Sequence, residues 1–233
     1  MKKNLRFHYL VLIIIMTGGL IFHTSCKKEE NKPEIEYGAA TDIDGNVYDA
    51  VTIGTQTWMM QDLKTSKYRN GDSVPTGLSD DDWMNATSGA CAIYNNDDDN
   101  NTTYGKLYNC YAVIDSRNLC PDGWHVPTDA EWTTLISYLG GESVAGGKLK
   151  EAGTTHWNDP NTATNKSGFT ALPAGTRSWY GPFNDIGNYG YWWSTSEGFA
   201  SGSWGRSMVN SENKVVRYNY TKEAGFSVRC VKD

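Results

Sequence analysis

The clearest hydrophobic pattern in the chain predicts a helix that begins at Asp129. Its apolar positions are spaced three or four residues apart, as on one face of a helix. They are Trp132, Leu135, Ile136 and Leu139. Thr128 and Glu131 form a Thr-x-x-Glu capping box, which satisfies two helix-end donors, and Gly140-Gly141 ends the pattern. One face of this helix is therefore expected in the core.

A second helix is predicted directly after the first, over Glu142 to Ala152. Its inward-facing positions would be Val144, Ala145 and Leu149, although Gly146-Gly147 weakens it by roughly 1 kcal/mol per glycine. Two helices are thus expected in the middle of the chain.

Short strands are expected on both sides of these helices. Asp44-Gly45-Asn46 predicts a hairpin turn, and residues 72–89 have the composition of a loop. From residue 169 onward, short aromatic runs alternate with glycine-rich turns, which is typical of an antiparallel sheet with long connections. These runs are Phe169 to Leu172, Tyr191 to Thr195, Trp204 to Val209, Val215 to Tyr220 and Phe226 to Val231. The pattern predicts an α+β fold.

The N-terminus has the layout of a secretory signal peptide. Three basic residues precede an apolar run from Leu10 to Phe22, which is shorter than the roughly 20 residues that span a bilayer as a helix. Thr24-Ser25-Cys26 resembles a lipoprotein processing site, so residues 1–25 are expected to be removed and Cys26 to be acylated. Cys26 would then anchor the chain to outer-membrane lipid. The alternative is an ordinary signal peptide that leaves Cys26 as a free thiol.

Residues 26–40 are polar and predict a flexible tether between the lipid and a domain at 41–233. The run from Cys26 to Glu30 resembles an export signal that places lipoproteins on the outer face of the outer membrane. The alternative is that this run is only a solvated spacer. We therefore expect an outer-membrane lipoprotein that is exposed on the cell surface.

Charge argues against a nucleic-acid partner. The chain has 21 basic and 27 acidic residues, and removal of residues 1–25 takes away three basic residues and no acidic one. The remaining 18 basic and 27 acidic residues give a net charge of minus nine, whereas nucleic-acid surfaces are basic.

Four cysteines remain once Cys26 carries lipid, and an even count in an oxidising compartment predicts disulfides. They are Cys91, Cys110, Cys120 and Cys230. Four cysteines allow three pairings. Because the chain has no Cys-x-x-Cys spacing, structural metal binding by these thiols is the weaker interpretation.

A set of ordered motifs resembles one known family. The motifs are Asp42 to Tyr48, Ile53 to Met59, Asp62 to Thr65, Tyr104 to Asn109, Cys120 to Trp132, Gly168 to Gly175 and Phe226 to Cys230. Together they resemble the Fibrobacter succinogenes major paralogous domain of bacterial surface and secreted proteins, over about Thr41 to Lys232. The segment from Cys120 to Trp132 also resembles formylglycine-generating sulfatase-modifying enzymes. The resemblance implies a C-type-lectin-like fold with two helices, antiparallel sheets and long loops.

This resemblance also implies a disulfide pattern. In lectin-like folds the termini meet in one sheet, which favours a Cys120–Cys230 bond, and Cys91 would then pair with Cys110. The family has tryptophan at the position of Cys110, which suggests that Cys91 and Cys110 arose as a pair.

An enzyme is the least favoured interpretation. The formylglycine-generating enzymes use a close pair of reactive cysteines that bind copper, and Cys230 has no neighbouring cysteine in its strand. His125 and His156 lack a serine or cysteine motif that would make either one a base. We therefore expect no catalytic residue.

One acidic stretch favours a weak calcium site. Residues 95–101 place oxygen ligands at alternate positions, and Ca²⁺ takes six to eight oxygens. The candidate ligands are Asp97, Asp99 and Asn101. The alternative is a solvated turn, because the glycine and glutamate of an EF-hand loop are absent. No other cofactor is expected.

Two ring-rich loops between residues 177 and 193 are the candidate ligand surface. Aromatic faces stack on sugars or peptides, and polar side chains fix the orientation of a ligand. The candidates are Arg177, Trp179, Tyr180, Asn184, Asp185 and Tyr189, with Phe183 and Tyr191 as further rings. The alternative is that most of these rings fill the core, which is the favoured interpretation for Trp192 and Trp193.

The leading functional hypothesis is a lipid-anchored, non-catalytic surface module that binds a glycan or a protein. A second hypothesis is a structural or adhesive component of the cell envelope without a small-molecule site. Fold analogy alone does not decide between them.

Overall fold

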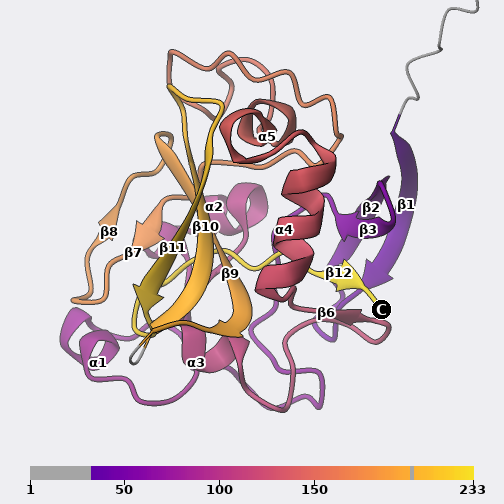
Figure 1. Cartoon of the computed structure of the whole chain (residues 1–233). Coiled ribbons are helices and arrows are strands. Elements are labelled where there is room, and N and C mark those ends of the chain that lie inside the picture. Colours follow the sequence, from indigo (N-terminus) through magenta and orange to yellow (C-terminus); the bar gives the residue numbers. More distant parts are fainter. Residues whose placement is uncertain (1–32, 200–201) are drawn as a thin grey trace, which may run out of the picture. The chain divides into compact units, whose positions relative to one another are not determined.

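Two antiparallel sheets dominate residues 33–199 and 202–233, the part of the chain that this computed structural model describes (Figure 1). The larger sheet has the strand order β1-β2-β3-β12-β6, and the smaller has the order β11-β10-β9. Two short ladders, β4-β5 and β7-β8, complete the strand pairing of the described residues. The fold is therefore α+β. No helix among the described residues is both long and apolar enough to cross a membrane.

The larger sheet and the first short ladder come mainly from the first half of the chain. Their strands are β1 (Glu34–Thr41), β2 (Val47–Ile53), β3 (Gln56–Met59), β4 (Cys91–Ala92), β5 (Leu107–Tyr108), β6 (Trp124–His125) and β12 (Val231–Lys232). The smaller sheet and the second ladder come from the second half. Their strands are β7 (Thr176–Arg177), β8 (Phe183–Asn184), β9 (Tyr189–Glu197), β10 (Gly202–Val209) and β11 (Val215–Thr221).

The predicted first helix is confirmed as α4 (Asp129–Tyr138). The hydroxyl of Thr128 accepts the N–H of Glu131, and the Glu131 carboxylate accepts the N–H of Thr128, so the capping box is complete. Gly140 and Gly141 end the helix with φ angles of 102° and 95°, which are left-handed values that favour glycine.

The second helix is α5 (Glu142–Leu149), which ends before the predicted Ala152. Three further helices are shorter, and the aromatic and apolar run from Lys106 to Ile114, which holds the last of them, was expected to form a buried strand or a short helix. They are α1 (Asp80–Met84), α2 (Asp98–Tyr104) and α3 (Cys110–Val113), with a 3-10 turn at Tyr94–Asn96. The segment 72–89, predicted to be a loop, therefore contains α1.

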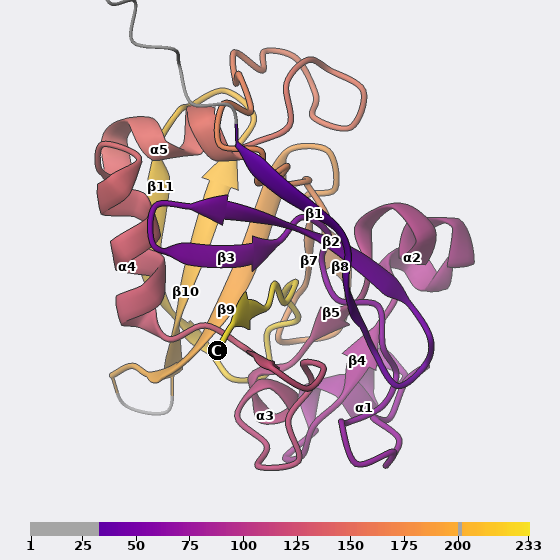
Figure 2. The same ribbon diagram turned by 90° about the vertical axis from the view of Figure 1, so that its right-hand side faces the viewer.

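Helix α4 joins the two sheets through buried tryptophans. The ring of Trp132 lies 4.8 Å from the ring of Trp58 on β3, and its indole N–H donates to the backbone oxygen of Trp193 on β9. Trp192 and Trp193 are fully buried, which confirms their predicted place in the core. Figure 2 shows β1, β2 and β3 in front of the smaller sheet, with α4 at their side.

The C-terminal strand occupies an interior place in the larger sheet. Val231 on β12 pairs with Trp58 on β3 and with His125 on β6. The predicted disulfide between Cys120 and Cys230 is present beside this strand, with its Cα atoms 6.1 Å apart. The sheet thus joins the beginning, the middle and the end of the described chain.

The predicted disulfide between Cys91 and Cys110 is wrong. Both thiols are free and buried. The sulfur of Cys91 lies 3.9 Å from the backbone oxygen of Val74, whereas the sulfur of Cys110 lies 2.9 Å from the hydroxyl of Ser203. The two thiols therefore have different neighbours, because Cys91 is on β4 and Cys110 begins α3.

The predicted tether is also too long. Cys26 and the processing site lie outside the described residues, but residues 34–40 belong to β1, which pairs with β2 from Glu34↔Thr52 to Thr41↔Val47. Backbone pairing with β2 gives this polar segment an order that its composition does not indicate. The described fold therefore begins ahead of Thr41.

Candidate functional site

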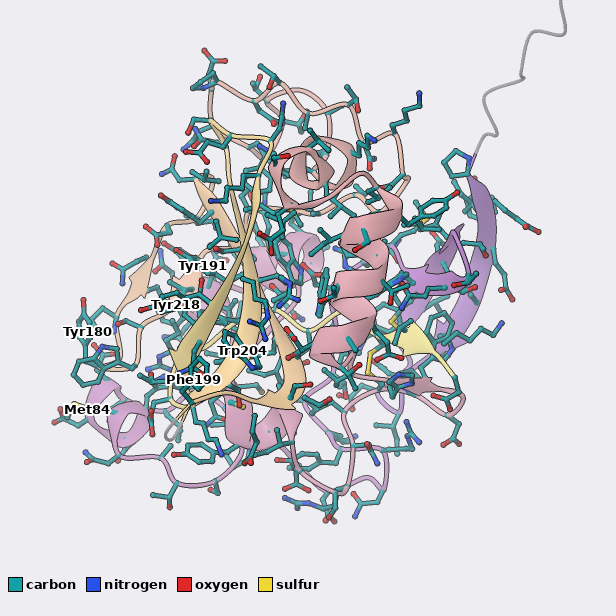
Figure 3. All side chains as sticks on the ribbon, viewed as in Figure 1. Met84, Tyr180, Tyr191, Phe199, Trp204 and Tyr218 are labelled. Carbon is teal, nitrogen blue, oxygen red and sulfur yellow. A yellow bond between two sulfur atoms is a disulfide. The ribbon has the colours of Figure 1, made fainter. Side chains whose placement is uncertain are left out.

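The β7–β8 hairpin carries two exposed aromatic rings at its tip. Trp179 and Tyr180 are 53% and 48% exposed, and their rings contact edge to face at 5.3 Å. Gly181 fixes the position of the tip, because its φ is 113° and a Cβ there would lie 2.3 Å from the Cβ of Asp80 on α1. The hairpin therefore holds these rings in solvent from a fixed base (Figure 3).

Arg177, predicted to bind a ligand, is instead part of that base. Its side chain is 1% exposed and donates to the backbone oxygens of Gly181 and Leu78 and to the carboxylate of Asp80. The guanidinium also lies 4.4 Å from the ring of Trp83 and 5.0 Å from that of Phe183. Arg177 and Phe183 therefore support the hairpin rather than face a ligand.

Opposite the hairpin, one face of the smaller sheet presents a row of tyrosines. On this face the central strand β10 contributes the small residues Ser203, Gly205 and Ser207 between larger residues of β9 and β11. The neighbouring rings at the solvent side are those of Tyr189 and Tyr191 on β9 and Tyr218 and Tyr220 on β11, which we call the tyrosine face. Helix α4 lies on the other side of the sheet (Figure 1).

The rings of β9 are stacked in a fixed order. Tyr191 is nearly parallel to Tyr189 at 5.7 Å and to Phe226 at 4.9 Å, with interplanar angles of 15° in both cases. Tyr220 meets Phe226 edge to face at 4.7 Å. Phe226 thus packs against two rings of the tyrosine face, those of Tyr191 and Tyr220.

A groove of about 330 Å³ lies between the hairpin and the tyrosine face. This volume is at the lower end of the range of small-molecule sites. The lining residues are Thr176, Ser178, Trp179, Asn184, Asp185, Tyr191, Tyr220, Ala224 and Phe226. Three of the predicted ligand residues, Trp179, Asn184 and Asp185, therefore line one groove, and Tyr180 and Tyr189 contact rings that do so.

Asp185 provides the charged group of this groove. It is exposed, has a left-handed φ of 72°, and accepts the backbone N–H groups of Asn188 and Tyr189 on its own backbone oxygen. Its carboxylate accepts the hydroxyl of Tyr191 at 3.0 Å. Burial, together with Asp185, raises the pKa of Tyr191 well above its usual value, so the phenol stays protonated at neutral pH. The groove therefore offers aromatic faces, a carboxylate, an amide and hydroxyls.

Several lining residues were not predicted. Tyr220, Ala224 and Phe226 lie 29 or more residues beyond Tyr191 in the sequence, and sheet register brings them to the groove. One sequence signal could have placed two of these rings together. Tyr218 and Tyr220 alternate with polar residues along a predicted strand, so both side chains belong to one face of the sheet.

The predicted calcium ligands have other roles. Asp97 caps α2 by accepting the N–H of Asp99, and the amide oxygen of Asn101 accepts the ammonium of Lys106 at 3.1 Å. The segment is helical, so the predicted loop with alternating ligands is wrong. Within residues 33–199 and 202–233, no three His, Cys, Asp or Glu side chains cluster in a way that could hold a metal ion.

The free thiols and the histidines have structural surroundings. Burial raises the pKa of Cys91 and of Cys110 to about 11, so both thiols are protonated at neutral pH. His125 lies between the carboxylates of Asp233 and Glu131, at 2.6 and 2.8 Å, and His156 contacts Glu151. None of these four residues lines the groove.

Comparison with known proteins gives one match. A family model described as the Fibrobacter succinogenes major domain matches residues 51–232, which is more than half of the chain. No curated protein and no solved structure matches. The matched residues include the larger sheet from the last three residues of β2 onward, both long helices and every residue of the groove. The chain belongs to the Fibrobacter succinogenes major domain family.

Proposed function

We propose that this chain is a lipid-anchored surface protein of the cell envelope, and that its groove binds a glycan without catalysis. The observation that carries the proposal is the groove itself. Trp179 on the hairpin and Tyr191 on the sheet line one hollow, with Asp185 beside them. A pair of rings around hydrogen-bonding groups is an arrangement that binds a partly apolar, hydroxylated ligand.

The chemistry of the groove favours a neutral sugar. A pyranose has C–H faces that stack on aromatic rings and hydroxyl groups at its edge that bond to carboxylates and amides. Asp185 and Asn184 supply these polar partners. Among the described residues that line the groove none is lysine or arginine, and the Arg177 guanidinium beneath it is paired with Asp80. An acidic sugar would find no counter-ion here.

The N-terminal sequence supports the anchored location. The basic residues, the short apolar run and Cys26 have the order of a lipoprotein signal.

We also propose that the fold is C-type-lectin-like, because the C-terminal strand closes a sheet that begins near the N-terminus and two helices precede the ring-rich strands.

The proposal of a non-catalytic role rests on the thiols. Formylglycine-type oxidation needs reactive cysteines, whereas Cys120 and Cys230 are bonded to each other and the other two described thiols are buried with raised pKa values. These groups therefore lack the accessible thiolate that such chemistry uses.

A glycan array probed with the whole chain tests the binding function. We expect binding to neutral glycans, and we expect Trp179→Ala to weaken it by about thirtyfold, as for a central aromatic contact of roughly 2 kcal/mol. Tyr37→Ala is the matched control, since Tyr37 is an exposed ring on β1, away from the groove residues. Equal binding by the Trp179 variant and the parent chain would contradict the proposal.

The second candidate is an adhesive contact with another envelope protein. It is favoured by apolar side chains that are exposed outside the groove, including Met84 and Phe199 (Figure 3). Binding to envelope proteins that depends on Phe199 and persists in Trp179→Ala, with no signal on the glycan array, would select this function instead.

A further inference from the structure

The tyrosine face continues beyond the groove to the edge of the smaller sheet. Tyr220 lines the groove and lies 6.1 Å from Tyr191, and Tyr218, which is not a lining residue of the groove, lies 5.2 Å from Tyr220. Tyr218 is 61% exposed. The row of rings therefore extends from the groove to Tyr218, which lies outside it.

The small residues of β10 make this path continuous. Gly205 pairs with Tyr218 on one side and with Trp193 on the other. A Cβ at Gly205 would lie 3.0 Å from the ring of Tyr220, so glycine lets that ring lie across the central strand. The hydroxyl of Tyr220 is held by Ser207 at 3.2 Å. The ring that connects Tyr191 with Tyr218 is thus fixed in place.

The path is open at its outer end. The strand order β11-β10-β9 leaves β11 at the edge of the sheet, and Val216 and Tyr218 of this strand are exposed on the ring side. The opposite side of β11 has a different role, because Arg217 there pairs with Asp129 of α4 and stacks on Trp204. The exposed rings of β11 therefore belong to the groove side alone.

We propose that Tyr218 and Tyr220 form a second subsite and that the ligand is a linear neutral glycan of several units, which crosses the sheet from Trp179 to Tyr218. This inference rests on the proposed glycan binding and specifies its ligand class. A site for a single terminal sugar needs only the groove. A chain of sugars uses a second ring platform, formed by Tyr218 and Tyr220, that is continuous with the first.

The test is a length series of linear neutral oligosaccharides of glucose, mannose, galactose and xylose, each with two and with six units, titrated into the whole chain. For the best-bound series we expect the six-unit sugar to bind about fivefold more tightly than the two-unit sugar, the gain from one added ring contact. Tyr218→Ala should remove this gain and leave the two-unit affinity within about twofold. Tyr218→Phe keeps the ring and should keep the gain.

The outcomes separate this inference from the proposed function. Equal affinity for two and six units, or a gain that survives Tyr218→Ala, overturns the second subsite while groove binding stands, provided that Trp179→Ala still weakens binding by about thirtyfold. No binding of any length by a parent chain with an intact Cys120–Cys230 bond overturns both. Near-UV circular dichroism of each variant shows that its aromatic core is folded.

Discussion

Two polar residues of the ring-rich loops, Arg177 and Asp185, have opposite roles that their sequence positions do not distinguish. Asp185 is exposed in the groove, whereas Arg177 is buried under the hairpin. The partners of Arg177 explain the difference, because Leu78 and Asp80 lie nearly a hundred residues earlier in the chain. A loop arginine is usually exposed, so only a long-range contact could reveal this burial.

Replacement of Arg177 should therefore destabilise the fold. Arg177→Ala removes the donors to two backbone oxygens and the buried contacts with Trp83 and Phe183, and we expect a loss of about 3 kcal/mol in the free energy of unfolding, as for lost hydrogen bonds and ring contacts of a buried guanidinium. Denaturant unfolding monitored by tryptophan fluorescence measures it. Arg117→Ala is the control, because its ion pairs with Asp72 and Asp115 are exposed and should contribute less than about 1 kcal/mol. Equal losses in the two variants would show that Arg177 is not a supporting residue.

At the scale of elements, regular local patterns were predicted and short or non-local ones were not. Helix α4 carries its own cap and apolar face, and β9 and β11 carry alternating rings. Helices α1, α2 and α3 span only four to seven residues, too few for a periodic pattern. Strand β1 mixes acidic with apolar residues, and it is held by its pairing with β2 and by Ile35 and Ala40, which pack on the core. Local signals therefore identified the framework and missed its connections.

The residues of the groove also divide into those that a local sequence pattern predicted and those that non-local contacts bring there. Trp179, Asn184 and Asp185 were predictable because they gather in one ring-rich segment. Tyr220 and Phe226 were not, because strand register and the return of the chain after β11 place them there. The side of a sheet on which a ring emerges depends on a one-residue choice of register, which sequence alone does not fix.

Three elements meet at His125, and this contact should make stability depend on pH. His125 on β6 bonds to Glu131 of α4 and to Asp233 after β12. Burial by itself lowers the pKa of His125, but the bonds to Asp233 and Glu131 outweigh it and raise the pKa above 6.5. The protonated form therefore stabilises the fold fully below pH 6.5, and this contribution is lost as the pH rises through the raised pKa.

Urea midpoints measured between pH 5 and pH 9 test this coupling. The parent chain should lose stability across the upper part of this range, and His125→Gln should show a flatter profile, because glutamine does not titrate. Glu131 has a lowered pKa and so opposes this trend only at more acidic pH, through and below its ordinary value of 4.5. A parent profile as flat as that of the variant would exclude the role of His125.

At the scale of the whole molecule, one disulfide links the segment just before β6 and α4 to the C-terminal strand. Cys120 and Cys230 are 110 residues apart, and their loop contains α4, α5 and the whole smaller sheet. The chain-entropy account assigns more stabilisation to longer loops, because the bond restricts the unfolded chain.

Removal of this disulfide should therefore be costly. We expect the double variant Cys120→Ala, Cys230→Ala to lose up to about 4 to 5 kcal/mol in the free energy of unfolding. Thermal unfolding by calorimetry checks this. Cys91→Ala is the control, since that thiol is free and buried and its replacement removes only one sulfur from the core. A smaller loss in the double variant than in the control would contradict the assignment of the bond.

The interior place of β12 has a consequence for how the molecule is made. Its neighbour β3 ends at Met59, and β12 begins at Val231, so β3 leaves the ribosome long before the strand that must lie against it. Contacts so distant along a chain form slowly. We expect the nascent polypeptide to keep this sheet incomplete until β12 has been synthesised and pairs with β3.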